Sequence, residues 1–184
     1  MSKRVASVTD PPPMVSDGAI PPGDLLVRTF QELRDDLLST LFFLLGHTED
    51  VQDVAQEVFM KCWRAREGLA GIQDLRAWIF RIGLNTAKDL RRSAWKRRAR
   101  PLQGEPNMIM SRHAPPAEEA ENREDCERLR QAILALRPEE QEVFLLRQNG
   151  DLTYEQIAEI RHSPVGTVKT QMRSALQKLR QVLA

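Results

Sequence analysis

The segment that most constrains the fold is residues 153–179, which read TYEQIAEIRHSPVGTVKTQMRSALQKL. Thr153 precedes a helical pattern, and Gln156 stands three residues later, at the spacing of a capping box. A second helix start is marked by Ser163, a preferred N-cap residue, and by Pro164, which suits the first helical position because no N–H is needed there. These signals predict two helices joined by a tight turn, as in a helix-turn-helix.

The second of these helices has an apolar side and a polar side. Its apolar residues recur at three- and four-residue spacing and are predicted to face a core: Val168, Met172, Ala175, Leu176 and Leu179. Its start and its flanks carry small, hydroxyl, amide and basic residues: Pro164, Gly166, Thr167, Lys169, Thr170, Gln171, Arg173 and Ser174. No acidic residue follows Glu159. The pattern favours a recognition helix in a DNA major groove, and the alternative is a plain helical hairpin.

The composition narrows the class of protein. The 184 residues carry a net charge of only +1, so nucleic-acid binding would depend on where the basic residues lie. Cys62 and Cys126 are far apart and the histidines offer no metal-ligand spacing, so we expect two reduced thiols and no metal or cofactor. We find no apolar run of membrane-spanning length and no signal peptide, which predicts a cytoplasmic protein without membrane insertion.

Two Pro-rich stretches divide the chain. Residues 1–22 contain prolines without helical periodicity, which predicts a disordered tail. Residues 101–121 also lack periodicity and become acidic toward their end, which predicts a flexible linker. Helical apolar repeats fill residues 23–100 and 122–184. We therefore predict an all-α protein of two small helical domains, the second a helix-turn-helix domain with a winged-helix-like outline.

Residues 23–100 are predicted to form three helices. Their start and stop signals are Asp24, Gly46, Thr48 and Asp74, with a loop at residues 67–73. The second helix carries a polar stripe of Asp53, Gln56, Glu57 and Lys61. A solvated face is the plain alternative to a binding role for this stripe.

The third helix carries two stripes. The apolar one is predicted to be buried and contains Leu75, Ile79, Ile82, Gly83, Thr86 and Leu90. The other contains Trp78, Arg81, Asn85, Lys88 and Arg92, and a basic run follows it from Arg91 onward. An aromatic ring, an amide and several cations on one stripe suit stacking on unpaired bases and neutralising phosphates. The alternative places Trp78 in the core and leaves the cations solvated.

The second domain is predicted to begin with a helix at residues 122–136, whose apolar spine is Leu129, Ile133 and Leu136. Pro138 then opens another helix, and Gly150 ends it. Together with the two helices of residues 153–179, this makes a domain of about four helices.

The motifs, in this order, resemble the extracytoplasmic-function (ECF) group of sigma-70 family factors. The matching blocks are residues 50–59 (DVQDVAQEVF), 78–85 (WIFRIGLN) continuing to Asp89 and Arg91-Arg92, 137–146 (RPEEQEVFLL), 153–158 (TYEQIA) and 164–169 (PVGTVK). The resemblance covers about residues 24–100 and 122–184, and no third domain fits between these segments.

The resemblance implies a subunit that directs core RNA polymerase to promoters and has no chemistry of its own. Residues Asp50, Asp53, Gln56, Glu57 and Phe59 would dock on the coiled coil of the polymerase β′ subunit. The −10 element would be held by Trp78, Arg81, Asn85, Lys88, Arg91 and Arg92, and the loop at residues 67–73 would receive a flipped base. The −35 element would be read by the polar residues listed above for the last helix.

The implied partners are core RNA polymerase through its β′ and β subunits, promoter DNA, and an anti-sigma factor. The linker would thread through the RNA exit path of the polymerase. Two departures from the family pattern concern the last domain. The turn carries Arg161 and His162 where a Gly and a small residue are usual, and Gln171 and Ser174 stand where arginines are frequent. Since Gln pairs with adenine and Arg with guanine, these departures predict either an unusual −35 sequence or a weaker contact with phosphates.

Other functions compete with this interpretation. A freestanding helix-turn-helix regulator would bind duplex DNA without polymerase, but it would have no use for the aromatic and cationic helix within residues 50–92. A degenerate sigma factor could serve mainly as the partner of a regulator. An enzyme is disfavoured, because no nucleophile, carboxylate pair or metal cluster converges in the sequence.

Overall fold

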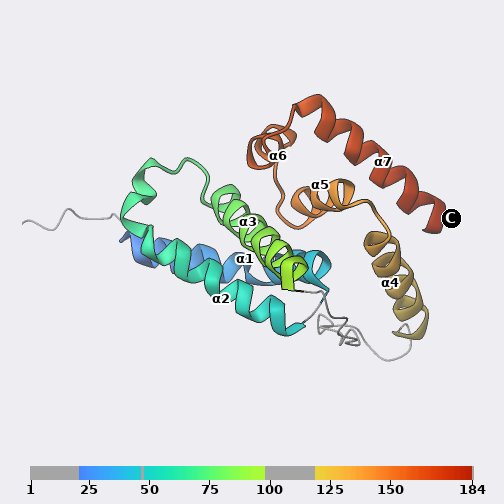
Figure 1. Ribbon diagram of the computed structural model, residues 1–184, viewed down its shortest axis with the longest axis horizontal. Helices are drawn as coiled ribbons and strands as arrows, with labels where there is room; N and C mark the ends of the chain where they lie inside the picture. Colours follow the sequence, from blue (N-terminus) through green and yellow to red (C-terminus); the bar gives the residue numbers. More distant parts are fainter. Residues whose placement is uncertain (1–20, 47, 98–118, 184) are drawn as a thin grey trace, which may run out of the picture.

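The computed structural model describes residues 21–46, 48–97 and 119–183, and every regular element in these ranges is a helix. The elements are α1 (Pro22–Leu45), α2 (Thr48–Arg64), the 3₁₀ helix η1 (Arg66–Gly71), α3 (Leu75–Arg97), α4 (Glu119–Leu134), α5 (Pro138–Gln148), α6 (Tyr154–Arg161) and α7 (Val165–Leu183). Helices α1 to α3 form one bundle, and α4 to α7 form a second group beside it (Figure 1). The all-α prediction is confirmed. These ranges hold no strand, so the winged-helix-like outline is not seen in them.

The predicted tail at residues 1–22 and the predicted linker at residues 101–121 fall mostly outside the described residues. Their inner ends are helical, because α1 begins at Pro22 and α4 begins at Glu119. Proline is favoured at a first helical position, and acidic residues are favoured near a helix N-terminus. Both helical segments therefore start a little earlier than predicted.

The bundle of α1, α2 and α3 surrounds a core of aliphatic side chains. Leu33, Leu37 and Leu41 of α1 pack with residues of α2 and α3 that are at most 2% exposed. Gly83 marks the close approach of α3 to α1, because a Cβ atom there would lie 2.9 Å from Leu37 Cδ1. Cys62 is also in this core, and burial raises the pKa of its thiol to about 12, so it is an unreactive packing group.

The helix ends of this bundle follow most of the predicted signals. Gly46 ends α1 in the left-handed conformation with a φ of 79°, which glycine adopts without steric cost. Asp74 caps α3 by accepting a hydrogen bond from the Ala77 N–H at 2.9 Å. The predicted cap at Asp24 is wrong, since α1 starts at Pro22 and Asp24 lies within its first turn. The loop predicted at residues 67–73 is mostly the short helix η1.

The buried face of α3 is wider than the predicted stripe. Phe80, Leu84 and Ala87, which the stripe leaves out, are at most 2% exposed. Leu75 and Ile82, which it includes, are only half-buried. The reason is that α3 packs against both α1 and α2, so side chains on two adjoining sides of the helix are covered. A single helical stripe predicts burial against one neighbour only.

Within the second group of helices, Val143, Leu146, Ile157, Val168 and Ala175 are fully buried. The capping box of α6 is confirmed. The Gln156 N–H donates to Thr153 Oγ1 at 3.2 Å, and the Thr153 N–H donates to Gln156 Oε1 at 2.7 Å. Pro138 opens α5 as predicted.

Two expectations for this domain are wrong. Ser163 does not cap α7, because its buried hydroxyl has no hydrogen-bond partner in the described part of the chain. The first turn of α7 is instead closed by the Pro164 carbonyl, which accepts from the Thr167 and Val168 N–H groups at 3.0 and 3.2 Å. Leu129 is not part of the apolar spine of α4, since it is 36% exposed and the neighbouring Ala132 is buried in its place.

The turn between α6 and α7 depends on His162, which adopts the left-handed conformation with a φ of 51°. A side chain in this conformation is strained relative to glycine, while glycine gains entropy in the unfolded chain. We expect His162→Gly to stabilise the second domain by about 0.5–1 kcal/mol. Amide hydrogen exchange in α6 and α7 measures this effect. His162→Ala is the control, because it keeps the Cβ atom, and equal exchange in both variants would contradict the prediction.

Candidate nucleic-acid interface

The start and open side of α7 present most of the residues predicted to meet DNA. The exposed ones are Pro164, Gly166, Thr167, Lys169, Thr170 and Arg173. Thr170 Oγ1 donates its proton to the Gly166 carbonyl at 2.9 Å. Toward a base edge, the Thr170 oxygen therefore acts as an acceptor, and its methyl group adds apolar contact.

One flank of α7 forms an open groove of about 760 Å³. Its lining consists of Tyr154, Lys169, Met172, Arg173, Leu176, Gln177, Arg180 and Gln181. Lys169 Nζ lies 5.8 Å from the centre of the Tyr154 ring and 4.0 Å from Glu155 Oε1. Because contacts at such exposed positions are weak, Lys169 can leave them for a phosphate.

The residues of this groove that the sequence-based prediction missed include Tyr154 and Arg180. Arg180 recurs with Lys169, Arg173 and Leu176 at three- and four-residue spacing, so the repeat was a usable signal for it. Tyr154 carried no such signal, since it belongs to a different helix and meets α7 only in the folded domain.

Polar side chains on the opposite flank of α7 form hydrogen bonds and ion pairs with other helices of the second domain. Gln171 Oε1 accepts a hydrogen bond from an Arg161 guanidinium nitrogen, and Arg161 Nε donates to Glu142 Oε2 at 3.0 Å. Bidentate pairing of glutamine with adenine needs that amide oxygen as well as the NH₂ group. With its oxygen held by Arg161, Gln171 offers a base only its NH₂ donor.

Ser174 and Lys178 on the same flank contact Glu140 at the start of α5. Ser174 Oγ donates to Glu140 Oε1 at 2.7 Å, and Lys178 Nζ lies 2.6 Å from Glu140 Oε2. The Arg137 N–H also donates to Oε2, at 3.2 Å. Burial alone would raise the pKa of Glu140, but these donors outweigh it and hold the pKa below its usual value. Ser174 is thus engaged in joining α7 to α5.

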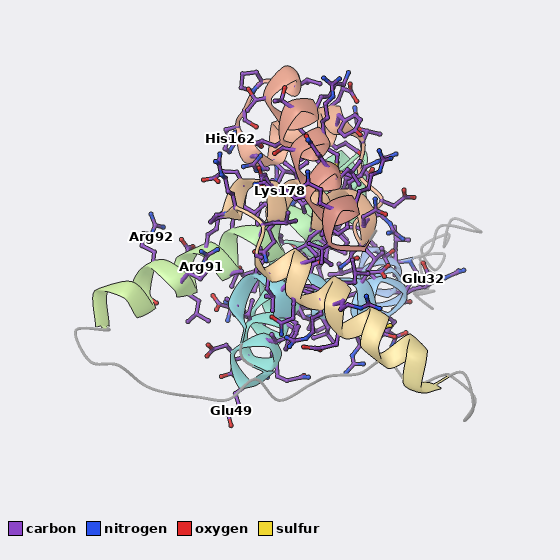
Figure 2. The ribbon with its side chains drawn as sticks, turned by 90° about the vertical axis from the view of Figure 1, so that its right-hand side faces the viewer. Glu32, Glu49, Arg91, Arg92, His162 and Lys178 are labelled. Atoms are coloured by element: carbon purple, nitrogen blue, oxygen red, sulfur yellow. The ribbon has the colours of Figure 1, made fainter. Side chains whose placement is uncertain are left out.

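The stripe predicted on α3 is divided between exposed and engaged side chains. Arg81, Asn85 and Arg91 are exposed, whereas Trp78 is half-buried and packs against the core. Arg92 projects outward from the C-terminal half of α3 (Figure 2) and forms an ion pair with Asp89 one turn earlier. Both interpretations of the stripe hold in part: Trp78 belongs partly to the core, and an exposed amide and several cations lie along the same helix.

Lys88 of the same stripe has a partner in the second domain. Its Nζ lies 2.9 Å from Oε2 of Glu142 on α5, and the Glu142 side chain is only 7% exposed. The cation therefore faces a nearly dehydrated carboxylate and not solvent alone. No pattern within residues 75–97 predicts this pair, because the partner comes from another domain.

The exposed side of α2 borders a groove of about 240 Å³ between α1 and α2. Its lining consists of Phe30, Arg34, Leu37, Leu38, Gln52, Ala55, Gln56 and Phe59. Asp53, Gln56 and Glu57 are exposed, and Asp50 is half-buried. Phe59 packs edge-to-face against Phe30, with the two ring centres 5.1 Å apart. Met60 is 39% exposed on the same helix. It follows Gln56 by four residues and Glu57 by three, so helical spacing was a usable signal that it belongs to this surface, and the sequence-based prediction missed it.

Glu57 and Phe59 lie on different sides of this surface. Glu57 pairs with Lys61 at 2.8 Å, and Lys61 Nζ also donates to Thr86 Oγ1 of α3 at 3.0 Å. Phe59 points toward α1 and contacts Trp63 with a centroid separation of 6.1 Å. The predicted binding face of α2 is therefore acidic on its α3 side and apolar on its α1 side.

These features define a two-domain helical DNA-binding protein, and comparisons with known proteins identify its kind. The sequence matches the family Sigma-70 region 2 over residues 29–97 and the family Sigma-70, region 4 over residues 126–179. It is 30% identical over 173 residues to the RNA polymerase sigma-H factor of Pseudomonas aeruginosa, covering 87% of this chain and 86% of that one. It is also 30% identical over 163 residues to the ECF RNA polymerase sigma-E factor of Haemophilus influenzae, covering 85% and 84%.

A solved structure supports the fold independently. The sigma factor RpoE of Bartonella quintana, solved in complex with the anti-sigma factor NepR, superposes with a TM-score of 0.71 at 18% identity, covering 85% of this chain and 95% of that one. The chain belongs to the sigma-70 family, in its ECF group. It is a promoter-specificity factor for transcription initiation.

Neither a membrane-spanning helix nor a metal-binding cluster is found among the residues that the structure describes. None of the helices in these ranges is long and apolar enough to cross a membrane. The same ranges contain no group of three or more His, Cys, Asp and Glu side chains placed to hold a metal ion.

Proposed function

We propose that three surfaces of this sigma factor have different binding roles in transcription initiation. Helix α2 binds core RNA polymerase, α3 with η1 binds the −10 element, and α7 binds the −35 element. The observation that carries this proposal is the placement of an acidic and apolar face on α2 beside a cationic face on α3. A freestanding helix-turn-helix regulator needs neither face, and the match to region 2 disfavours it.

For polymerase binding, the groove between α1 and α2 offers an apolar slot bordered by exposed polar residues. Gln56 and Phe59 line it, and Asp53 and Glu57 lie on the same helix outside it. Apolar contact at the centre with charged residues at the rim is the usual anatomy of a protein interface. We assign Asp50, Asp53, Gln56, Glu57 and Phe59 to the β′ coiled coil, and we add Met60 and Gln52 to this surface.

For the −10 element, the exposed residues Arg81, Asn85 and Arg91 offer cations for phosphates and an amide for a base edge. Trp78 supports this face by packing partly into the core. We assign the flipped base to the segment of residues 66–73, where Gly68 and Gly71 leave open space around the backbone. Leu69 anchors this segment by its burial.

The remaining roles concern partners and chemistry. Since RpoE was solved in complex with an anti-sigma factor, we propose an anti-sigma partner for this chain as well. We also propose that the factor works in the cytoplasm and contributes binding and positioning, while the polymerase supplies the catalytic site. The path proposed for the linker through the RNA exit channel concerns residues outside those described.

Runoff transcription with core RNA polymerase on a genomic promoter library tests this proposal. The wild type should initiate at sites that share two sequence boxes. We expect Lys169→Ala to weaken initiation severalfold at all promoters, because Lys169 is placed to meet a phosphate. We expect Gln171→Ala to change the preferred −35 bases, because the NH₂ donor is lost.

A control variant and the possible outcomes distinguish phosphate contact by Lys169 from base reading by Gln171. Gln148→Ala, an exposed amide on α5, is the control and should leave the selected boxes unchanged. Uniform weakening by both Lys169→Ala and Gln171→Ala would show that Gln171 reads no base. Duplex binding without any core-dependent initiation would favour the freestanding regulator.

A further inference from the structure

Arg161, the last residue of α6, links a buried carboxylate of α5 to a residue of α7 that is predicted to read a base. Its Nε donates to Glu142 Oε2 at 3.0 Å, and one of its terminal nitrogens donates to Gln171 Oε1. The Arg161 and Glu142 side chains are 8% and 7% exposed, whereas Gln171 is half-buried on the flank of α7. One chain of hydrogen bonds therefore runs from the interior of the domain to the side of α7.

The chemistry of arginine determines which end of the Gln171 amide faces it. A guanidinium group has five N–H donors and no acceptor, so it can form a hydrogen bond only with the oxygen of an amide. The Gln171 oxygen is therefore turned toward Arg161, and the NH₂ group is turned away from it. A glutamine without such a partner can present either end of its amide to a base, and Arg161 removes this choice.

Glu142 fixes the position of Arg161. A guanidinium group presents its donors in a rigid planar fork, and here one donor meets the carboxylate while another meets the amide. Because the donor and the acceptor are both charged, the hydrogen bond to Glu142 is of the strong kind. Lys88 of α3 also lies 2.9 Å from Glu142 Oε2, so each domain supplies a cation to this carboxylate, and Arg161 is the one that continues to α7.

We infer that Arg161 is a positioning residue for base recognition: it makes Gln171 a donor-only reader that selects guanine at one position of the −35 element. This inference rests on the proposed function of α7. In the major groove, guanine presents two neighbouring acceptors, whereas adenine presents an acceptor beside a donor. Thymine presents one acceptor beside a methyl group, and cytosine presents a donor. Guanine is therefore the base that best suits an NH₂ group whose amide oxygen is already engaged.

The position of Gln171 in the sequence alone favours the opposite preference, since glutamine in the major groove usually pairs with adenine. Arg161 does not read a base itself, because its side chain is buried at the end of α6. It acts through the amide that it orients. Arg161 and Gln171 are both positions at which the sequence departs from the family pattern, and a hydrogen bond joins the two departures.

The test uses full-length protein with core RNA polymerase and a library of barcoded promoters that is randomised in the −35 box. Sequencing of the transcripts gives the ratio of guanine to adenine at each position. Arg161→Lys keeps a cation for Glu142 but loses the planar fork, because its single nitrogen stays with the carboxylate. The double variant Arg161→Met/Glu142→Met removes both charged groups together, a replacement that folded proteins often tolerate. Arg130→Lys is the control, since Arg130 forms a similar pair with Glu127 within α4.

We expect the wild type to prefer guanine over adenine at the position where Gln171→Ala loses its preference. Arg161→Lys and the double variant should both lower the ratio of guanine to adenine there by about fivefold to tenfold, the range for one bidentate contact. Arg130→Lys should leave the ratio unchanged. In the Gln171→Ala background, Arg161→Lys should move no base ratio, because the side chain through which it acts is missing.

Three results would overturn the inference. A wild-type preference for adenine at this position would show that the Gln171 oxygen is available to the base. Unchanged ratios in both Arg161 variants, with transcription lowered equally at all promoters, would show that Arg161 only stabilises the fold. A shift that persists in the Gln171→Ala background would show that Arg161 acts through another residue. Failure of the proposed function has a different signature, because the wild type itself would then select no −35 box, and the inference would fail with it.

Discussion

Replacing Glu57 with lysine should lower the affinity for core RNA polymerase about 100-fold, which corresponds to about 3 kcal/mol. Glu57 is exposed on the proposed polymerase-binding face of α2, so the substitution reverses a charge without opening the core. A like-charge contact across an interface costs several kcal/mol. Within the free protein, the new lysine meets Lys61 one turn later, at a cost of only a few tenths of a kcal/mol. Fluorescence anisotropy with labelled sigma factor and core polymerase measures the affinity.

Two control variants make the Glu57 result specific. Asp35→Lys makes the same charge change on α1, where the Asp35 side chain is 95% exposed and does not line the groove. It should leave the affinity within about twofold of the wild type, as surface charges away from an interface generally do. Glu57→Gln removes the charge without reversing it and should give an intermediate loss. Normal affinity of Glu57→Lys, with an unchanged circular dichroism spectrum, would show that this side of α2 does not meet the polymerase.

Replacing Glu140 with alanine should destabilise the second domain by about 3 kcal/mol, since it removes a buried carboxylate with several donors. Glu140 is 4% exposed and joins α5 to α7 through Ser174 and Lys178. Hydrogen exchange of the amides in α5 and α7 measures the loss. The neighbouring Glu139 is exposed in the same first turn, so Glu139→Ala is the control. Tryptophan fluorescence should not change, because Trp63, Trp78 and Trp95 all belong to the first domain.

The hydrogen bonds and ion pair of Glu140 also predict how the stability of the second domain changes with pH. The pKa of Glu140 is lowered in the folded state, so the ionised form is the one that the fold stabilises. The contribution is therefore complete above the ordinary value of 4.5 and is lost as the pH falls through the lowered value. Wild-type protection in α5 and α7 should decrease in this acid range more steeply than in Glu140→Gln. Parallel decreases in the two proteins would show that Glu140 does not titrate in this way.

The sequence predicted the helices of this protein well where local signals act alone. The capping box at Thr153, the proline at the start of α5 and the glycine that ends α1 are all read from neighbouring residues, and each is confirmed. The cap at Ser163 failed because the Pro164 carbonyl closes the first turn of α7 instead. The predicted buried face of α3 was too narrow, because α3 packs against both α1 and α2. A single apolar stripe indicates burial against one neighbouring helix only.

By itself, the sequence determined the all-α class, the two helical domains and the family, since helical periodicity, caps and ordered motifs are local properties of the chain. Only the tertiary structure decided which polar side chains are free to bind. Gln171, Ser174 and Lys88 have the same polar character in the sequence as Thr167 and Arg81, yet they are engaged by Arg161, Glu140 and Glu142. The partners lie on other helices, and in one case on the other domain. Periodicity reports which side of a helix is polar, but a distance between two helices is set by packing.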